Sequence, residues 1–301
     1  MAHIPVMVAE VLQYLDPKPG QHFVDCTLGE GGHTAAILER TAPGGRVLAF
    51  DLDPEAIAMV KDKLASFGDR LTAVNANFSS IESTVGNEKF GPVSGVLLDL
   101  GFSSAHIEER HRGFSFMKDE PLDMRYSGSA SIGGGQQLTA AEIVNSWPKD
   151  EIAHIIAEYG EERCAMNIAA AIVTARRKER ILTTTQLVNI IRSAVPGNYE
   201  QGRIHPATRT FQAIRIAVND ELGSITETLP RALNVLEVGG VIVSIAFHSL
   251  EDRICKQFFS EQEKNGALEV LTPKPLVASD AEVNDNPRSR SAKLRAARKI
   301  K

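Results

Sequence analysis

The sequence predicts an α/β fold in which a block of helices interrupts a mostly parallel sheet. Short runs rich in Val and Leu alternate with segments of helical spacing in the first third of the chain, and this alternation returns near its end. Strands of this composition, separated by helices, are typical of a parallel sheet covered on both faces. The expected domains are a discontinuous α/β domain, residues 1–112 and 209–301, and an inserted all-helical domain, residues 113–208.

Strands are expected at five places, each a short apolar run: residues 22–26, 46–51, 71–78, 93–101 and 239–247. The helix after the second strand has a clear start, because Asp53 suits the N-cap and Pro54 the first helical position. Residues 210–237, just before the fifth strand, are expected to be helical. The basic residues 286–301 that end the chain are assigned no strand.

Inside the helical block, two capping boxes mark helix starts, at Thr139 with Glu142 and at Thr183 with Gln186. A break is expected at Gly160, and a stop at Pro196. The Gly- and Ser-rich stretch "SGSASIGGGQQ" has the composition of a surface loop.

Composition excludes several classes of protein. The chain has 301 residues, 43% of them hydrophobic, and a formal net charge of −5, so any contact with nucleic acid must come from a local basic patch. Its three cysteines form no CxxC pair, which argues against a zinc site or a disulfide framework and favours a reducing compartment. The sequence has no signal-peptide pattern and no apolar run of membrane-spanning length, so the cytoplasm is the expected location. No bound metal is expected.

The stretch "DCTLGEGGHT" places three glycines where the first strand hands over to a helix. Ligands bind at such turns in open α/β sheets, and glycine permits positive φ and a close approach of the backbone. The spacing is not GxGxxG, and no Lys-Ser/Thr pair follows, so a pyrophosphate-binding loop is disfavoured. A tight turn with no ligand is the alternative interpretation.

Three acids favour a ligand at this turn. Asp25 precedes the glycines, and Asp99 ends the fourth strand. Asp51 ends the second strand, at the separation along the sequence from which a carboxylate binds ribose hydroxyls in such folds. Buried carboxylates cost stability unless they are paired, and a sulfonium cofactor with an adenosine would pair them. This combination resembles the first two motifs of S-adenosylmethionine-dependent methyltransferases.

Longer motifs along nearly the whole chain resemble one family. They include "HIPVMVAEVL", "DCTLGEGGHT", "DLDPEAI", "LLDLGFSS", "ERHRGFSF", "PLDMR", "HPATRTFQAIRIAVNDEL", "FHSLEDR" and "NPRSRSAKLR". They are similar to the RsmH, or MraW, family of bacterial methyltransferases, which modify N4 of a cytosine in small-subunit ribosomal RNA. The resemblance implies a Rossmann-like class I methyltransferase domain with a helical insert, and S-adenosylmethionine as cofactor. It also implies a decoding-centre cytosine of 16S rRNA as target, in an assembled or nearly assembled 30S subunit.

The resemblance also implies which residues bind the cofactor. By motif match they are Gly31, Gly32 and His33 on the methionine and adenosine side, Asp51 on the ribose, Phe78 beside the adenine, and Asp99 closing the pocket. His106 stands where the family usually has a glutamine.

No catalytic base is evident from the sequence. The N4 lone pair of cytosine is delocalised into the ring, so the enzyme must orient the amine and accept a hydrogen bond from it. Many amino-methyltransferases use a Pro-Pro-aromatic motif after the fourth strand, and here "DLGFSS" has no proline. Asp99, Asp123 and His248 are the candidates, and a structural hydrogen bond is an equal interpretation for the last two.

Basic residues at the end of the chain predict an RNA contact, because phosphate attraction supplies most nonspecific RNA affinity. The residues expected to bind RNA are Arg288, Arg290, Lys293 and Arg295. A solvated tail is the alternative. A second basic cluster, residues 176–180, is either an RNA clamp or a helix C-terminus stabilised by positive charge. Phe114 and Phe116 are either base-stacking surfaces or core residues.

Two other functions remain open at this stage. One is methylation of N4 in DNA or of a small molecule, which the basic tail and the missing proline motif disfavour. The other is a non-catalytic ribosome-assembly factor that keeps the cofactor fold as a scaffold, which the intact glycine loop, Asp51 and Asp99 disfavour.

Overall fold

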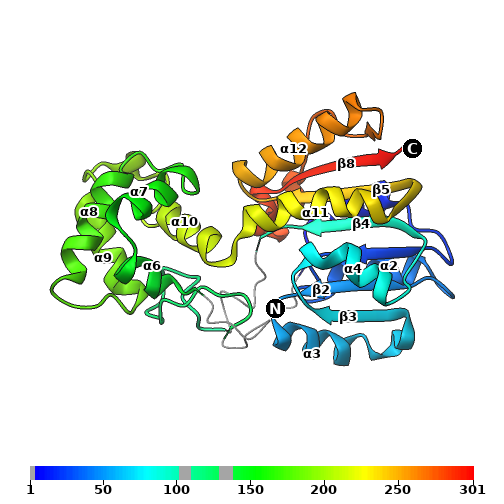
Figure 1. Ribbon diagram of the computed structural model, residues 1–301, viewed down its shortest axis with the longest axis horizontal. Helices are drawn as coiled ribbons and strands as arrows, with labels where there is room; N and C mark the ends of the chain where they lie inside the picture. The colour runs from blue at the N-terminus through cyan, green and yellow to red at the C-terminus, as the bar shows by residue number, and fades with distance from the viewer. Residues whose placement is uncertain (1–3, 102–109, 129–137) are drawn as a thin grey trace. The chain divides into compact units, whose positions relative to one another are not determined.

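A computed structural model describes residues 4–101, 110–128 and 138–301 of the chain, which divides into two compact units (Figure 1). The sheet unit comprises Met1–Phe102 and Leu222–Lys301, and the helical unit comprises Ser103–Glu221. The helical unit therefore extends beyond the boundaries expected from the sequence, 113 and 208, at both ends.

The sheet unit is built on a sheet of eight strands among the residues described, in the order β3-β2-β1-β4-β5-β8-β6, with β7 paired to β8. The strands are β1 His22–Asp25, β2 Val47–Asp51, β3 Leu71–Asn75, β4 Val93–Asp99, β5 Leu236–Ala246, β6 Leu268–Val270, β7 Leu276–Val277 and β8 Lys293–Lys299. The first five pair in parallel, and β8 pairs antiparallel to β5, β6 and β7. The α/β fold class and the five expected strands are confirmed.

Helices cover both faces of this sheet. Successive strand residues point to opposite sides, and because both sets are apolar, each face is buried against helices. One face packs against α1 Val8–Leu15, α2 Gly32–Arg40 and α3 Pro54–Lys63. The other packs against α4 Ile81–Asn87, α11 Glu221–Val235 and α12 Ser249–Lys264. Phe23 and Val24 show the alternation, since each is buried in a different one of these two cores.

The helical unit contains five helices among the residues described. They are α6 Ala140–Ser146, α7 Lys149–Glu158, α8 Ala165–Arg176, α9 Thr184–Ala194 and α10 Thr208–Asn219. Both expected capping boxes are present, at Thr139 and Thr183, and Asp53 caps α3 in the sheet unit as predicted. Phe114 is buried in the core of the helical unit, and the ring of Phe116 stacks on His205 at 4.6 Å, so both rings pack within the unit.

The helical structure expected over residues 210–237 is confirmed as far as residue 235, and it is divided into two helices. The chain leaves the helical path at Asp220, whose φ of 46° is left-handed, so that α10 and α11 are separate helices. Phe211 and Ile214 of α10 are buried in the core of the helical unit, which explains why that unit extends past residue 208.

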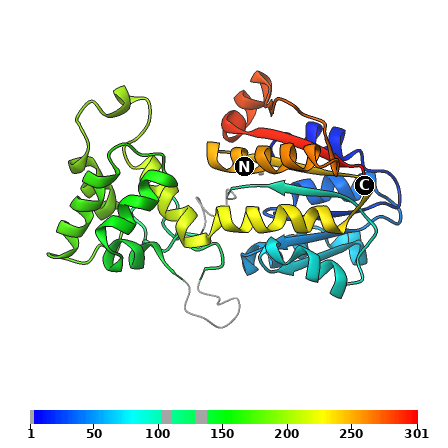
Figure 2. The same ribbon diagram turned by 45° about the horizontal axis from the view of Figure 1, so that its top comes forward.

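The end of the chain is also more ordered than the sequence indicates. Figures 1 and 2 show the C-terminal strand, coloured red, within the sheet unit. Leu294 and Ala296 of β8 are fully buried on one face of the sheet, and Ala297 is buried on the other. A short helix, α13 Asp280–Asp285, precedes this strand. None of the helices in the described ranges has the length and apolar character needed to cross a membrane.

We expect the change Leu294→Ala to lower the free energy of unfolding of the sheet unit by about 2–5 kcal/mol, the usual cost of emptying a fully buried Leu site. Hydrogen exchange of the β5 amides in rising urea measures this, because Leu294 pairs with Ile245. Ile300→Ala, at a side chain that is 47% exposed, is the control. Equal stability of the two variants would show that β8 adds nothing to the sheet.

Candidate functional site

The three acids predicted to share one edge do so. Asp25, the last residue of β1, lies opposite Ala49 of β2 and Leu97 of β4. Asp51 and Asp99 each lie two residues further along, at the carboxyl ends of their strands. Because the three strands are neighbours, the glycine loop after β1 begins between two carboxylates.

The Asp25 carboxylate forms its hydrogen bonds with other residues of the protein. Its side chain is buried, and the carboxylate accepts hydrogen bonds from the Thr34 hydroxyl at 2.7 Å and the Thr27 N–H at 3.0 Å. Burial raises the pKa of Asp25, and these hydrogen bonds and His33 only partly oppose the rise. Thr27 also accepts the N–H of Asp99 at 2.8 Å, so it ties the ends of β1 and β4 together. No sequence pattern indicated a role for either threonine.

Asp51 combines two fixed hydrogen bonds with capacity for more. One carboxylate oxygen accepts the Gly29 N–H at 2.9 Å, and the other accepts the Asp53 N–H at 2.8 Å. A carboxylate has about four acceptor sites, so roughly two remain for a ligand. Burial raises the pKa of Asp51 to about 7, although both N–H bonds oppose the rise. Asp51 therefore titrates in the neutral range.

His33 and Asp99 form a buried pair with unused polar atoms. His33 Nε2 lies 3.3 Å from Asp99 Oδ2, an ion-pair distance, but the two atoms are not aligned for a hydrogen bond. Both ring nitrogens and Asp99 Oδ1 are buried and have no hydrogen-bond partner among the residues described. Burial lowers the pKa of His33, but Asp99 and then Asp25 outweigh it, and the net shift is upward. Unpartnered polar atoms are costly, so a ligand that bonds to them gains affinity.

The glycines of the loop serve the protein's own packing. Gly31 caps α2 with a left-handed φ of 77°, and a Cβ there would lie 2.8 Å from a methyl group of Val60. A Cβ on Gly32 would lie 2.7 Å from the ring of Pro5. Contacts within the sheet unit therefore require a residue without a side chain at these two positions. From the sequence, we attributed this requirement to the close approach of a ligand.

Phe78 begins the short 3-10 helix η2 Phe78–Ser80, just after β3. Its ring is partly buried against the core beneath β3, and Asn77 fixes the turn by accepting the Ser79 N–H at 2.8 Å. The aromatic face predicted beside an adenine is thus held on a capped turn. His106, the other residue expected on this side, lies outside the described residues.

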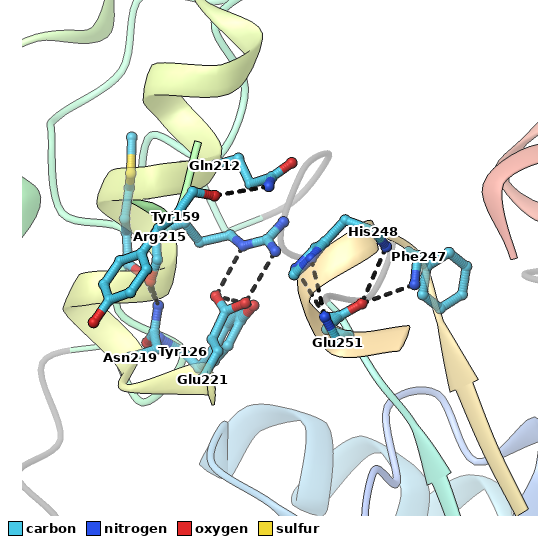
Figure 3. A network of polar contacts seen from close by, with 10 residues as sticks. Tyr126, Tyr159, Gln212, Arg215, Asn219, Glu221, Phe247, His248 and Glu251 are labelled. Carbon is cyan, nitrogen blue, oxygen red and sulfur yellow. Dashed lines mark hydrogen bonds and ion pairs between the residues drawn. The ribbon is translucent and has the colours of Figure 1, made fainter. Parts of the chain in front are cut away.

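His248 has a structural role at the start of α12 (Figure 3). Its Nδ1 accepts the Glu251 N–H, and in return the Glu251 carboxylate accepts the His248 N–H at 3.3 Å. The same carboxylate also accepts the Phe247 N–H at 2.8 Å. Because Nδ1 must be unprotonated to accept, the ring is assigned as the Nε2–H tautomer, with Nε2 3.2 Å from Glu251 Oε1. The capping box therefore uses only Nδ1, and Nε2 is buried with no hydrogen-bond partner among the residues described.

Asp123, in the helical unit, is neutralised by its neighbour. Arg125 donates two side-chain bonds to its carboxylate, at 2.8 and 2.6 Å, and one backbone bond at 3.0 Å. A second pair in the same unit, Arg215 with Glu221, is also bidentate (Figure 3). Both acids are therefore engaged in holding the helical unit together.

The basic residues near the C-terminus divide into two groups. Arg295 is buried and donates to Asp252 at 2.6 Å, while Lys293 lies 3.5 Å from the same carboxylate. Burial raises the pKa of Asp252, but Arg295 and Lys293 outweigh it and the net shift is downward. A buried, paired guanidinium does not reach a phosphate, so the prediction that Arg295 binds RNA is corrected. Arg288 and Arg290 are exposed.

A family model for the MraW methylase family matches residues 1–300. The chain belongs to the MraW methylase family. Three relatives carry the name ribosomal RNA small subunit methyltransferase H. That from Heliobacterium modesticaldum is 47% identical over 99% of both chains. That from Geobacter sulfurreducens is 48% identical over 99% of both. That from Symbiobacterium thermophilum is 47% identical over 99% of this chain and 96% of its own.

Family membership confirms the resemblance found in the sequence, the enzyme class, a methyltransferase, and the cofactor, S-adenosylmethionine. The residues at the sheet edge fit that cofactor. Asp51 has spare acceptor sites for hydroxyl groups, and the unpartnered atoms of His33 and Asp99 are buried beside the loop. S-adenosylmethionine supplies a methyl group on a positively charged sulfur, which a negatively charged edge attracts.

We expect cofactor affinity to fall as the pH drops through about 7, because the carboxylate form of Asp51 accepts hydroxyl bonds and the protonated form has lost acceptor capacity. Above pH 7 the affinity should be full. Asp51→Asn should bind at least about tenfold more weakly, since bonds to a charged group contribute roughly 1.5–3 kcal/mol each.

Calorimetry of wild type and Asp51→Asn between pH 5.5 and 8.5 makes this comparison. Titration of His33 and of the cofactor contributes to both profiles, so their difference isolates Asp51. Parallel profiles with equal affinity would remove Asp51 from the cofactor site.

Proposed function

We propose that this chain methylates N4 of a decoding-centre cytosine in 16S rRNA, in an assembled or nearly assembled 30S subunit. The relatives' shared name supports small-subunit rRNA as the substrate, and with that substrate we propose the cytoplasm as the location. The structural observation that supports transfer to an amine is the buried pair at the sheet edge. Asp99 Oδ1 is an acceptor with no partner among the described residues, next to the loop assigned to the cofactor.

The proposed cofactor contacts follow the sheet edge. Asp51 binds the ribose hydroxyls, Phe78 flanks the adenine, and His33 and Asp99 face the methionine side. Gly31 and Gly32 contribute backbone at the start of α2, where the first N–H groups lack helical partners, although the Gly31 N–H already donates to the Leu28 carbonyl at 2.8 Å. His106 is retained as a proposed contact from the motif match alone.

Asp99 is the proposed acceptor for the target amine. The N4 lone pair of cytosine is delocalised into the ring, and a hydrogen bond from the amine to a carboxylate makes the pair more available for transfer. Asp123 is set aside for this role because Arg125 occupies its carboxylate. His248 is set aside as an acceptor because its Nδ1 accepts the Glu251 N–H, which leaves the proton on Nε2. A cytosine in a duplex must first leave the stack to reach such a buried edge.

RNA attraction is assigned to the exposed arginines that precede β8. Arg288 and Arg290 have exposed side chains and keep the RNA role proposed from the sequence. Lys293 and Arg295 contact Asp252, Arg298 contacts Glu269, and Lys299 donates to the carbonyls of Leu233 and Leu236. The even choice between an RNA clamp and a helix end for residues 176–180 is unchanged, although Arg176 Nη1 donates to the Val144 carbonyl at 3.0 Å.

The substrate proposal predicts labelled methyl transfer to N4 of cytosine in small ribosomal subunits from a strain lacking the enzyme. Nucleoside mass spectrometry identifies the modified position, and Asp99→Asn should lose most of the rate while keeping its fold. Subunits that already carry the modification are the control. Label on the ring carbon, on the ribose oxygen or only on DNA contradicts the proposal.

The RNA-contact proposal predicts a smaller salt dependence of rRNA binding for Arg288→Ala with Arg290→Ala. Losing two phosphate contacts should reduce the slope of log affinity against log salt by about 1.5–2. Lys61→Ala with Lys264→Ala removes the same charge from exposed positions on α3 and α12 and is the matched control. If both double variants share one slope, the two arginines do not contact RNA.

A further inference from the structure

The N-terminal segment of the sheet unit, residues 4–7, lies directly against the glycine loop. The ring atoms of Pro5 come within 2.7–3.2 Å of the place where a Cβ on Gly32 would be. Val6 and Met7 are buried beside it, 5% and 1% exposed. Gly32 immediately precedes His33, so the position of Pro5 limits where the loop can lie.

Two side chains from the far end of the sequence hold this segment. Glu282 Oε1 accepts the Met7 N–H at 2.6 Å, and Asn286 Nδ2 donates to the Ile4 carbonyl at 3.0 Å. The two bonds lie on either side of Pro5. Met7 has a left-handed φ of 53°, a conformation that a non-glycine residue adopts only when its surroundings impose it.

The anchoring residues are themselves held in place. Ser279 caps α13 by accepting the Glu282 N–H at 3.2 Å. The Asn286 carbonyl accepts both the backbone N–H and the hydroxyl of Ser289, at 3.0 and 2.8 Å. Residues 279–289 therefore form a fixed support that leads into β8.

Glu282 also acts on the loop through its charge. Burial lowers the pKa of His33, and Asp99, Asp25 and Glu282 raise it, in decreasing order. These three acids, from β4, β1 and α13, are the described groups whose charges act on the ring. The Glu282 carboxylate thus accepts a hydrogen bond from the segment that packs on Gly32, and its charge raises the pKa of His33.

We propose that Glu282 and Asn286 are positioning residues for the cofactor loop, which they hold through residues 4–7 and Pro5. This rests on the proposed assignment of Gly31–His33 to the cofactor. Neither residue touches the cofactor in this role. The hydrogen bond from the Met7 N–H to Glu282 fixes the segment that packs on Gly32. The position of Gly32 in turn determines where α2 begins.

The test compares Glu282→Ala, Glu282→Gln and the control Asp285→Ala, an exposed acid on the same short helix. Hydrogen exchange of the cofactor-free protein is read at the first turn of α2, where the Ala35 N–H donates to the Gly31 carbonyl at 2.9 Å. Calorimetry with S-adenosylmethionine gives the affinity. Glu282→Ala should exchange faster at this turn and bind about tenfold more weakly, because only the molecules in which this turn is in place can bind the cofactor.

Glu282→Gln separates the bond from the charge. Its amide oxygen still accepts the Met7 N–H, so exchange and affinity should stay near wild type. Its neutral side chain should lower the pKa of His33, measured from the imidazole NMR signals, and a residue that acted only through its hydrogen bond would not produce this shift.

Asn286→Ala provides a second variant with the same expected loosening if Glu282→Ala does not fold. Exchange and affinity equal to those of Asp285→Ala in both alanine variants would overturn the proposal. Because no RNA is used, a failure of rRNA methylation in the wild type would count against the proposed function and leave this result independent.

Discussion

The accumulation of negative charge at one edge of the sheet is the constraint on which the site depends. Asp25, Asp51 and Asp99 end three adjacent parallel strands, and carboxylates removed from water are costly unless they are bonded. The loop after β1 supplies part of what they need: two threonine hydroxyls and the Gly29 N–H as hydrogen-bond donors, and the ring of His33 at ion-pair distance from Asp99. The conformation of the glycine loop is thus set by the acids around it.

The three acids differ because their partners differ. Asp25 has its bonds satisfied within the protein and acts as an internal tie. Asp51 holds two backbone groups and keeps acceptor sites for a ligand. Asp99 keeps an oxygen that no described residue satisfies, beside a histidine in the same condition. Incomplete satisfaction at a buried edge is a cost to the fold that a bound ligand can offset, and it explains why function is concentrated there.

The two ends of the sequence support this edge from outside the parallel strands. The C-terminal strand β8 pairs with β5, and α13 just before it holds the N-terminal segment against the glycine loop. The same arrangement consumes most of the basic charge of the C-terminal region, because Arg295 must be neutralised by Asp252 where it is buried. Some of the basic residues that the sequence offers for RNA binding therefore form ion pairs within the sheet unit instead.

The sequence by itself determined the elements whose signals are local. Alternating composition, N-caps and capping boxes predicted β1–β5, the starts of α3, α6 and α9, and the acids at one sheet edge, because these depend on residues near one another in the chain. Tertiary structure decided the rest. "KLRAARK" is a strand only because the edge of β5 offers hydrogen bonds, and α10 separates from α11 at Asp220, with α10 packing in the core of the helical unit. Likewise, the roles of Pro5, Glu282 and Arg295 depend on partners far away in sequence, which no local pattern reveals.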